Sequence, residues 1–106
     1  MHTDQQSSAD LGLVLVGLGE SLIGLDRPRD ALPLLCEALR LWAQGSAEVM
    51  VEARTRFALA RALDAGRSSS WALRHARKAH AGYEAAGERA RRERRAVESW
   101  MRARDR

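Results

Sequence analysis

Residues 17–39, GLGESLIGLDRPRDALPLLCEAL, contain three closely spaced glycines, a charged turn and a leucine-rich run. Such a stretch is either a glycine loop that holds a phosphate before a helix or a helical hairpin whose glycines allow close packing. A phosphate loop of the G-x-x-x-x-G type continues with Lys and then Ser or Thr. Gly19 and Gly24 have that spacing, but Leu25 and Asp26 follow. The stretch therefore favours the helical hairpin.

The composition indicates one small all-α domain. The chain has 106 residues, which is enough for one domain and too few for a large internal active site. Alanine, leucine and arginine dominate, and these residues are strong helix formers. The only prolines are Pro28 and Pro33. We expect about five helices arranged as antiparallel hairpins.

The expected helices are separated by turn residues at regular intervals. Residues 1–8 are polar and are predicted to form a disordered tail, and residues 9–106 a single helical domain. The domain divides into a hairpin over 9–44, a hairpin over 47–87 and a terminal capping helix over 88–104.

Capping residues give the expected helix ends. Ser8 or Asp10 is predicted to cap the first helix, which ends near Gly24. Asp26 is predicted to cap the second helix, with Pro28 in its first turn. The later boundaries are expected at Gln44-Gly45-Ser46, at Gly66 with Ser68-Ser69-Ser70, and at Gly87.

The first expected helix is apolar on every side. Its apolar residues are Leu11, Leu13, Val14, Leu15, Val16, Leu18, Leu22, Ile23 and Leu25. Such a helix must be covered on more than one side, and the second helix covers only one. We expect the rest to be covered by an upstream repeat, a partner's helix or a second copy of the chain, which makes a homo-oligomer one of the alternatives.

The sequence matches itself at an offset of 41 residues, as expected for a two-helix repeat. The matched pairs are Leu18 with Leu59, Gly19 with Ala60, Leu22 with Leu63, Ala31 with Ala72, Leu32 with Leu73, Ala38 with Ala79, and Trp42 with Tyr83.

This pattern resembles the tetratricopeptide repeat, in a variant longer than the common 34 residues. The residues that carry the resemblance are Leu15-x-x-Leu18-Gly19-x-x-Leu22 with Ala31-x-x-x-Leu35-x-x-Ala38, and Leu59-Ala60-x-x-Leu63 with Ala72-x-x-x-Ala76-x-x-Ala79. In the second copy Arg56 stands where an aromatic residue is usual, and neither copy has the usual closing proline. The segments RFALARALDAG and HARKAHAGYEAAG also resemble the C-terminal repeat regions of bacterial serine/threonine kinases and regulators.

The resemblance implies an α-solenoid fragment whose first helices line a concave, partner-binding face. Repeat proteins hold peptides or partner helices in such grooves. The residues that the family analogy places on this face are Leu13, Val16, Glu20, Ile23, Arg54, Phe57, Arg61 and Asp64.

The sequence offers no set of residues suited to catalysis or metal binding. His75 and His80 are five residues apart, about 140° around a helix, whereas helical zinc pairs use the i, i+4 spacing. Cys36 lies among leucines, where a half-buried, inert thiol is expected. We expect no catalytic residues, no metal and no cofactor, and hence no enzyme.

The last expected helix holds the whole net charge of +4. Residues 88–106 contain eight arginines and four acids, and the other residues are balanced. A basic surface at Arg91, Arg92, Arg94 and Arg95 would suit nucleic acid or an acidic partner. Interleaved glutamates favour a solvated face instead, so we do not expect nucleic acid to be the partner.

The sequence also predicts a cytoplasmic protein that does not cross a membrane. A single cysteine excludes an internal disulfide, the N-terminus has no basic start of a secretory signal, and the apolar run over 11–25 is too short to span a bilayer. We therefore expect a non-catalytic scaffold that binds another protein or a peptide in a bacterial signalling or regulatory assembly. The alternative is a small basic helical protein that binds nucleic acid through its last helix.

Overall fold

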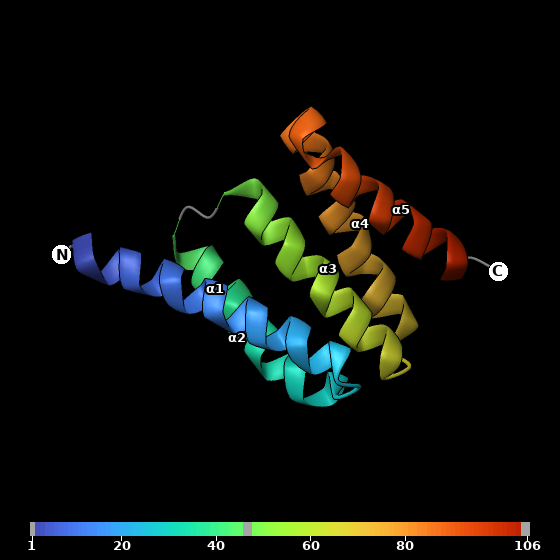
Figure 1. The fold of residues 1–106 in the computed structure, drawn as a ribbon, viewed down its shortest axis with the longest axis horizontal. Helices are drawn as coiled ribbons and strands as arrows, with labels where there is room; N and C mark the ends of the chain where they lie inside the picture. The colour runs from blue at the N-terminus through green and yellow to red at the C-terminus, as the bar shows by residue number, and fades with distance from the viewer. Residues whose placement is uncertain (1, 46–47, 105–106) are drawn as a thin grey trace.

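The computed structural model describes residues 2–45 and 48–104, with side chains from Ser8 onward. Within these residues the chain is all-α, with no strand, and forms antiparallel helical hairpins, as the sequence predicts. Its elements are α1 (His2–Gly24), α2 (Pro28–Gln44), α3 (Val49–Ala65), α4 (Ser69–Ala86), the 3-10 turn η1 (Gly87–Ala90) and α5 (Arg91–Arg104). Helices α1, α3 and α5 face the viewer in Figure 1, and α2 and α4 lie behind them.

The start of α1 differs from the expectation. The helix begins at His2, so residues 2–8, which were expected to form a disordered tail, continue it. No glycine or proline interrupts residues 2–11, so no residue in this segment breaks the helix. Helix α3 begins at Val49, with Glu48 at the N-cap. The predicted cap at Ser46 falls outside the described residues.

The two hairpins turn in the same way, 41 residues apart. The turn residue has a left-handed backbone, with φ of 62° at Asp26 and 69° at Arg67. In each turn the next backbone N–H donates to a carbonyl five residues back, which is the Schellman arrangement that ends a helix. These bonds run from Arg27 N to Leu22 O at 2.8 Å and from Ser68 N to Leu63 O at 2.9 Å.

The prediction that Asp26 caps α2 is therefore wrong. Its left-handed backbone belongs to the end of α1, and the N-cap position of α2 is Arg27, which makes no capping hydrogen bond with its side chain. Pro28 stands in the first turn, as predicted, where its missing N–H costs nothing. Ser68 occupies the N-cap of α4, also without a side-chain hydrogen bond.

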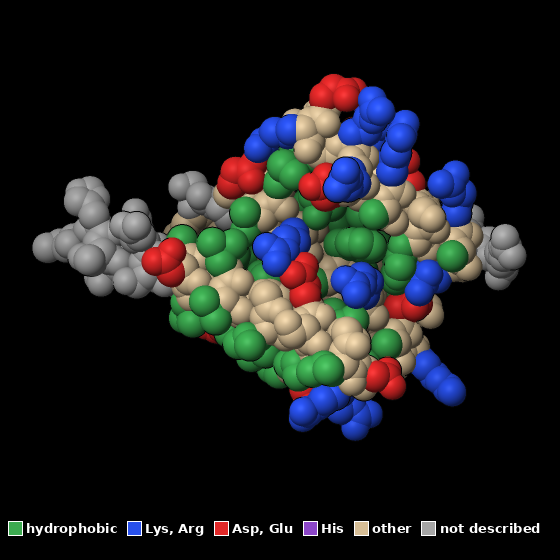
Figure 2. Space-filling model, in the orientation of Figure 1, with side chains coloured by type: hydrophobic (Ala, Val, Ile, Leu, Met, Phe, Trp, Pro, Cys, Tyr) green, Lys and Arg blue, Asp and Glu red, His purple; other side chains and the backbone are tan. Residues whose placement is uncertain are grey.

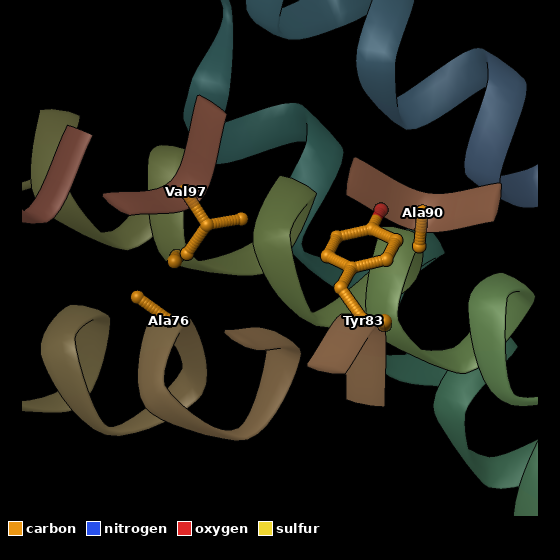
Figure 3. Packing of buried hydrophobic residues seen from close by; sticks show 6 residues of the cluster. Ala76, Tyr83, Ala90 and Val97 are labelled. Carbon is orange, nitrogen blue, oxygen red and sulfur yellow. The ribbon is translucent and has the colours of Figure 1, made fainter. Parts of the chain in front are cut away.

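The buried positions of α2 and α4 match at the same offset. In α2 these include Ala31, Leu35, Ala38 and Trp42, and in α4 they are Ala72, Ala76, Ala79 and Tyr83. Small residues predominate, so the helices approach closely. Figure 3 shows two members of the second set, with Val97 of α5 above Ala76 and the ring of Tyr83 beside Ala90.

Two glycines of α1 are explained by this close approach. A Cβ atom at Gly19 would lie 2.7 Å from Leu35 Cδ2, and one at Gly12 would overlap the Trp42 ring. The glycines let α2 press the side chains of Leu35 and Trp42 against the α1 backbone. This packing agrees with the hairpin interpretation of the stretch over 17–39.

Helix α2 also packs against α3, through a buried polar pair. Trp42 Nε1 donates a hydrogen bond of 2.9 Å to Thr55 Oγ1, and the Thr55 hydroxyl donates to the carbonyl of Val51. Both polar atoms of this fully buried contact are thereby satisfied.

Helix α5 closes the far side of the second hairpin. Trp100 meets Phe57 edge to face, with ring centroids 5.9 Å apart. Arg104 Nε donates to Asp64 Oδ2 at 2.9 Å, and its guanidinium lies over the Trp100 ring. These contacts hold α5 against α3 as well as α4, so a hollow forms between α1, α3 and α5.

Candidate functional site

A groove of about 400 Å³ lies on the face formed by α1, α3 and α5. Figure 2 shows this face, where charged side chains surround an apolar hollow near its centre. Helix α3 forms the floor, α1 and α5 form the walls, and α4 contributes one residue from behind. The lining residues are Glu20, Met50, Val51, Arg54, Phe57, Ala58, Arg61, Tyr83 and Glu93.

An ion pair between α1 and α3 forms one wall. Arg54 donates two hydrogen bonds to Glu20, from Nε at 2.9 Å and from Nη2 at 2.5 Å. This fork geometry is the strongest form of an arginine–carboxylate pair, and it raises the pKa of Arg54. Because both side chains are partly exposed, the pair contributes only about 0.2–1 kcal/mol to stability. Its main effect is to hold α1 at a set position beside α3.

Two other charged residues of the groove have no ion-pair partner among the described residues. Arg61 lies over the Phe57 ring, 5.9 Å from its centroid, and Glu93 stands on α5 near Tyr83. Met50 and Arg61 are eleven residues apart on α3, which separates them by about 16 Å. The groove therefore has an acidic end near Met50 and Glu93 and a basic end at Arg61.

Tyr83 supplies an aromatic surface between these ends. Its ring is buried, and burial raises its pKa to about 12, with a further rise from the Glu93 carboxylate. The hydroxyl therefore stays protonated at neutral pH and remains a hydrogen-bond donor. Together with Met50 and Phe57 it gives the groove an apolar floor.

Four of the eight residues expected on the concave face come together in this groove: Glu20, Arg54, Phe57 and Arg61. The other four do not line it. Val16 is fully buried, and Ile23 packs against the cluster around Leu35, because both face the interior of the first hairpin. Leu13 is exposed, and Asp64 is paired with Arg104.

The sequence interpretation missed Met50, Tyr83 and Glu93 as groove residues. Tyr83 belongs to the apolar stripe of α4, so its pattern indicates only burial. Glu93 was detectable, because it stands between Ala90 and Val97 at helical spacing and thus on the inward face of α5. An acid on an inward face is a signal of a polar site.

The arginines of the last helix are divided between two sides. Arg91, Arg92 and Arg95 lie around a second hollow of about 630 Å³, together with Arg89, Glu88 and Glu93. Arg94 does not join them: it lies 3.8 Å from Glu98 on its own helix, and its Nε is buried. The expected basic surface therefore has three of its four members.

The histidines and the cysteine lie apart. His75 contacts Arg56, and His80 pairs with Glu98 at 2.8 Å, a hydrogen bond that lowers the pKa of Glu98. Cys36 is exposed, not half-buried as expected, because it points away from both α1 and α3. No group of three or more His, Cys, Asp or Glu residues suited to a metal ion is found in the described part of the chain.

None of its described helices is long and apolar enough to cross a membrane.

Comparison with known proteins finds no relative. No protein-family model matches the chain, and neither a curated protein nor a solved structure matches it.

Proposed function

We propose that this chain is a non-catalytic protein-binding domain of the tetratricopeptide type, and that it works in a cytoplasmic signalling or regulatory assembly of bacteria. Support for the fold assignment comes from the 41-residue offset, which the Schellman turns and the buried positions of α2 and α4 share. Two hairpins that repeat their turn and core in this way are typical of helical repeat proteins.

The observation that carries the proposal is the groove over α3. It combines an apolar floor of Met50, Phe57 and Tyr83 with a cation at one end and an anion at the other. Mostly apolar grooves with a few placed polar groups are typical binding sites. A segment about 16 Å long suits it, which is roughly ten residues of helix or five of extended chain.

The charges of the groove define the segment that fits. An acidic residue of the bound segment would pair with Arg61, and a basic residue with Glu93, with apolar side chains between them. Arg54 is already paired with Glu20, so it is a wall of the site and not its anchor.

The test is photo-crosslinking from inside the groove in cells of the source organism. With p-benzoylphenylalanine at Met50, we expect discrete adducts with another protein, and none with the same group at Lys78, which is exposed on α4. Adding Arg61→Glu should abolish the adducts, and Arg77→Glu, an equal charge change on α4, should leave them. Adducts of equal yield from Met50 and Lys78, or from neither position, would contradict the proposal.

The nucleic-acid alternative rests on a different surface. Arg92 and Arg95 have no acidic partner among the described residues, which favours it, but Glu88 and Glu93 border the same hollow and weaken its field. This alternative predicts binding of duplex DNA that falls steeply with added salt and is lost when Arg91, Arg92 and Arg95 are neutralised. Binding to a short duplex at low salt, measured by fluorescence anisotropy, tests it directly.

A further inference from the structure

The outer face of α4 is basic and carries an exposed tryptophan. Its members, here called the α4 surface, are Trp71, Arg74, Arg77 and Lys78, and all four are exposed. They fall within an arc of about 120° on the side of the helix opposite the buried stripe of α4. No acidic residue occurs between Asp64 and Glu84, so no carboxylate of this segment weakens the positive field.

The three cations of the α4 surface have no ion-pair partner among the described residues. Arg77 borders a hollow of about 390 Å³, together with Arg102 of α5, which is also unpaired within the described chain. The acid of this hollow, Glu98, is paired with His80. The cations of the α4 surface are therefore available to an anion from outside the chain.

The equivalent face of α2 shows that the fold does not require these residues. At the 41-residue offset, Trp71 corresponds to Asp30 and Lys78 to Glu37. Each of those two acids is paired with an arginine three residues away. The same helix position is thus internally neutralised in one hairpin and basic in the other, so packing between helices does not account for the α4 surface.

We infer that the α4 surface binds single-stranded nucleic acid, with its three cations on the phosphates and Trp71 stacked on a base. A basic track combined with an exposed aromatic ring is how proteins hold single strands without sequence preference. The distance along the helix from Trp71 to Lys78 is about 10.5 Å. This length matches about three nucleotides at the spacing of about 3.4 Å per phosphate along one strand.

Trp71 selects this class of polyanion. It is the only exposed large hydrophobic side chain after Leu25 in the described residues. A protein interface has an apolar core, and a helix that lies on a membrane has an apolar face, whereas the apolar stripe of α4 is buried. One exposed ring is sufficient for an unpaired base, because stacking needs one flat surface. Arg74 lies over the ring, 4.9 Å from its centroid, so a phosphate on Arg74 would hold its nucleotide beside the indole.

His75 senses the positive field of the α4 surface. Burial lowers the pKa of His75, and the charges of Arg56, Lys78 and Arg74 lower it further. Two cations of the α4 surface therefore act on the same imidazole. A bound phosphate would oppose these charges and raise the pKa of His75.

The α4 surface is separate from the other two surfaces considered for this chain. None of its members lines the groove over α3, and none borders the hollow with Arg92 and Arg95 on α5. Protein binding in the groove and nucleic-acid binding on α4 can therefore be tested independently of each other.

The first test is the fluorescence anisotropy of a labelled single strand of about 12 nucleotides, titrated with the protein at several salt concentrations. We expect binding whose logarithmic salt slope is about −2, as for three phosphate contacts, and a slope smaller by about 0.7 for Lys78→Gln. Trp71→Ala should weaken binding about 5–150-fold and leave the salt slope unchanged.

Matched controls come from the other surfaces. Arg92→Gln, an equal charge change on α5, should leave the affinity and the salt slope unchanged. Leu18→Ala, which shortens a similarly exposed apolar side chain on α1, should leave the affinity unchanged. No binding at low salt, wild-type affinity in Trp71→Ala, or equal effects of Arg92→Gln and Lys78→Gln would overturn the inference.

The second test is competition against the bound single strand. Inorganic polyphosphate at the same phosphate concentration should compete less well than an unlabelled single strand, and this difference should disappear in Trp71→Ala. Duplex DNA should also compete less well, because its bases are already stacked and paired. Equal competition by polyphosphate, equal competition by duplex, or tighter binding to phosphatidylserine vesicles would contradict base stacking on Trp71.

The third test follows the pKa of His75 by NMR of its ring protons. We expect the pKa to rise when the single strand is added. The rise should be smaller for Lys78→Gln and should be retained in Arg92→Gln. An unchanged pKa in the saturated complex would place the strand elsewhere and refute the assignment to the α4 surface.

Discussion

Helices α1 and α3 begin the two hairpins and end in the same turn, yet their surroundings differ. The face of α3 that contains Thr55 and Leu59 is buried under α2, and the matching face of α1, with Val14 and Leu18, is exposed. The exposed face is the more apolar of the two. Burial in this fold is therefore set by which helix has a neighbour, and hydropathy alone does not distinguish the two faces.

The contact inside each hairpin differs in an informative way. Gly19 packs against Leu35 in the first hairpin, and the matching positions in the second, Ala60 and Ala76, are both alanines of one cluster. A glycine–leucine pair and an alanine–alanine pair fill the contact in different ways. The two hairpins thus fill equivalent contacts with different distributions of side-chain volume, as expected for a close-packed interior.

The largest expected effect comes from removing the large member of this pair. Leu35→Ala should lower the free energy of unfolding by about 2–5 kcal/mol, because Leu35 is fully buried and its loss leaves a cavity. Leu25→Ala, the same change at an exposed position, should change it by less than about 0.5 kcal/mol. Urea denaturation followed by circular dichroism measures both. Similar values for the two variants would mean that Leu35 is not in a packed core.

Substitution of the small member, Gly19, should have opposite effects on stability in the wild type and in the Leu35→Ala variant. Gly19→Ala alone should cost about 1–3 kcal/mol, since the new Cβ meets Leu35. In the Leu35→Ala background it should instead stabilise by about 0.5–1 kcal/mol, because the clash is gone and alanine favours the helix. Gly17→Ala serves as the control, because a Cβ atom at Gly17 would meet no described atom within 4 Å. Additivity of Gly19→Ala and Leu35→Ala would refute the volume argument.

The buried polar pair between α2 and α3 has no counterpart on α1, where Val14 stands at the position of Thr55. Thr55→Val should cost about 1–3 kcal/mol, because the indole N–H of Trp42 would be left unsatisfied. A double-mutant cycle with Trp42→Phe should give a coupling of about 0.5–3 kcal/mol. The cycle of Trp42→Phe with Tyr83→Phe, which belong to separate clusters, should be additive within about 0.5 kcal/mol. A coupling of zero for the first pair would show that the hydrogen bond does not form.

The smallest expected effect is on the pH dependence of stability. It comes from His75, which lies in the second hairpin. Burial lowers the pKa of His75 from 6.5, and the neighbouring charges of Arg56, Lys78 and Arg74 lower it further. The fold thus favours the neutral ring, so its contribution to stability is present above pH 6.5 and is lost as the pH falls below that value. Between pH 7.5 and 5 the melting temperature of the wild type should fall more than that of His75→Gln. An equal fall of the melting temperature in both proteins would show that the pKa of His75 is the same in the folded and unfolded states.

Local patterns in the sequence were sufficient for most of the fold. Pro28, Gly66 and Gly87 mark helix boundaries because proline and glycine break the helical hydrogen-bond pattern in known ways. The 41-residue offset identifies the buried residues of α2 and α4. Asp26 was misassigned because an aspartate suits both an N-cap and a left-handed turn, and only the backbone φ separates the two.

The candidate site was predictable only in part. Glu20, Arg54 and Arg61 were expected on one face and do line one groove. Val16 was expected there too, but α1 is rotated so that Val16 faces the core. That rotation follows from the contacts of Gly12 and Gly19 with α2 and from the ion pair with Arg54, which are long-range features that no local pattern specifies.

The sequence by itself determined the helical class, most helix ends and the 41-residue offset between the hairpins, because these depend on backbone propensities within a few residues. The tertiary structure alone decided which face of α1 is buried, where Glu93 meets Tyr83, and that Arg94 is separated from the other arginines. Those features depend on how whole helices rotate and pack against one another, and a helix that is apolar on every side carries no local signal that selects one rotation.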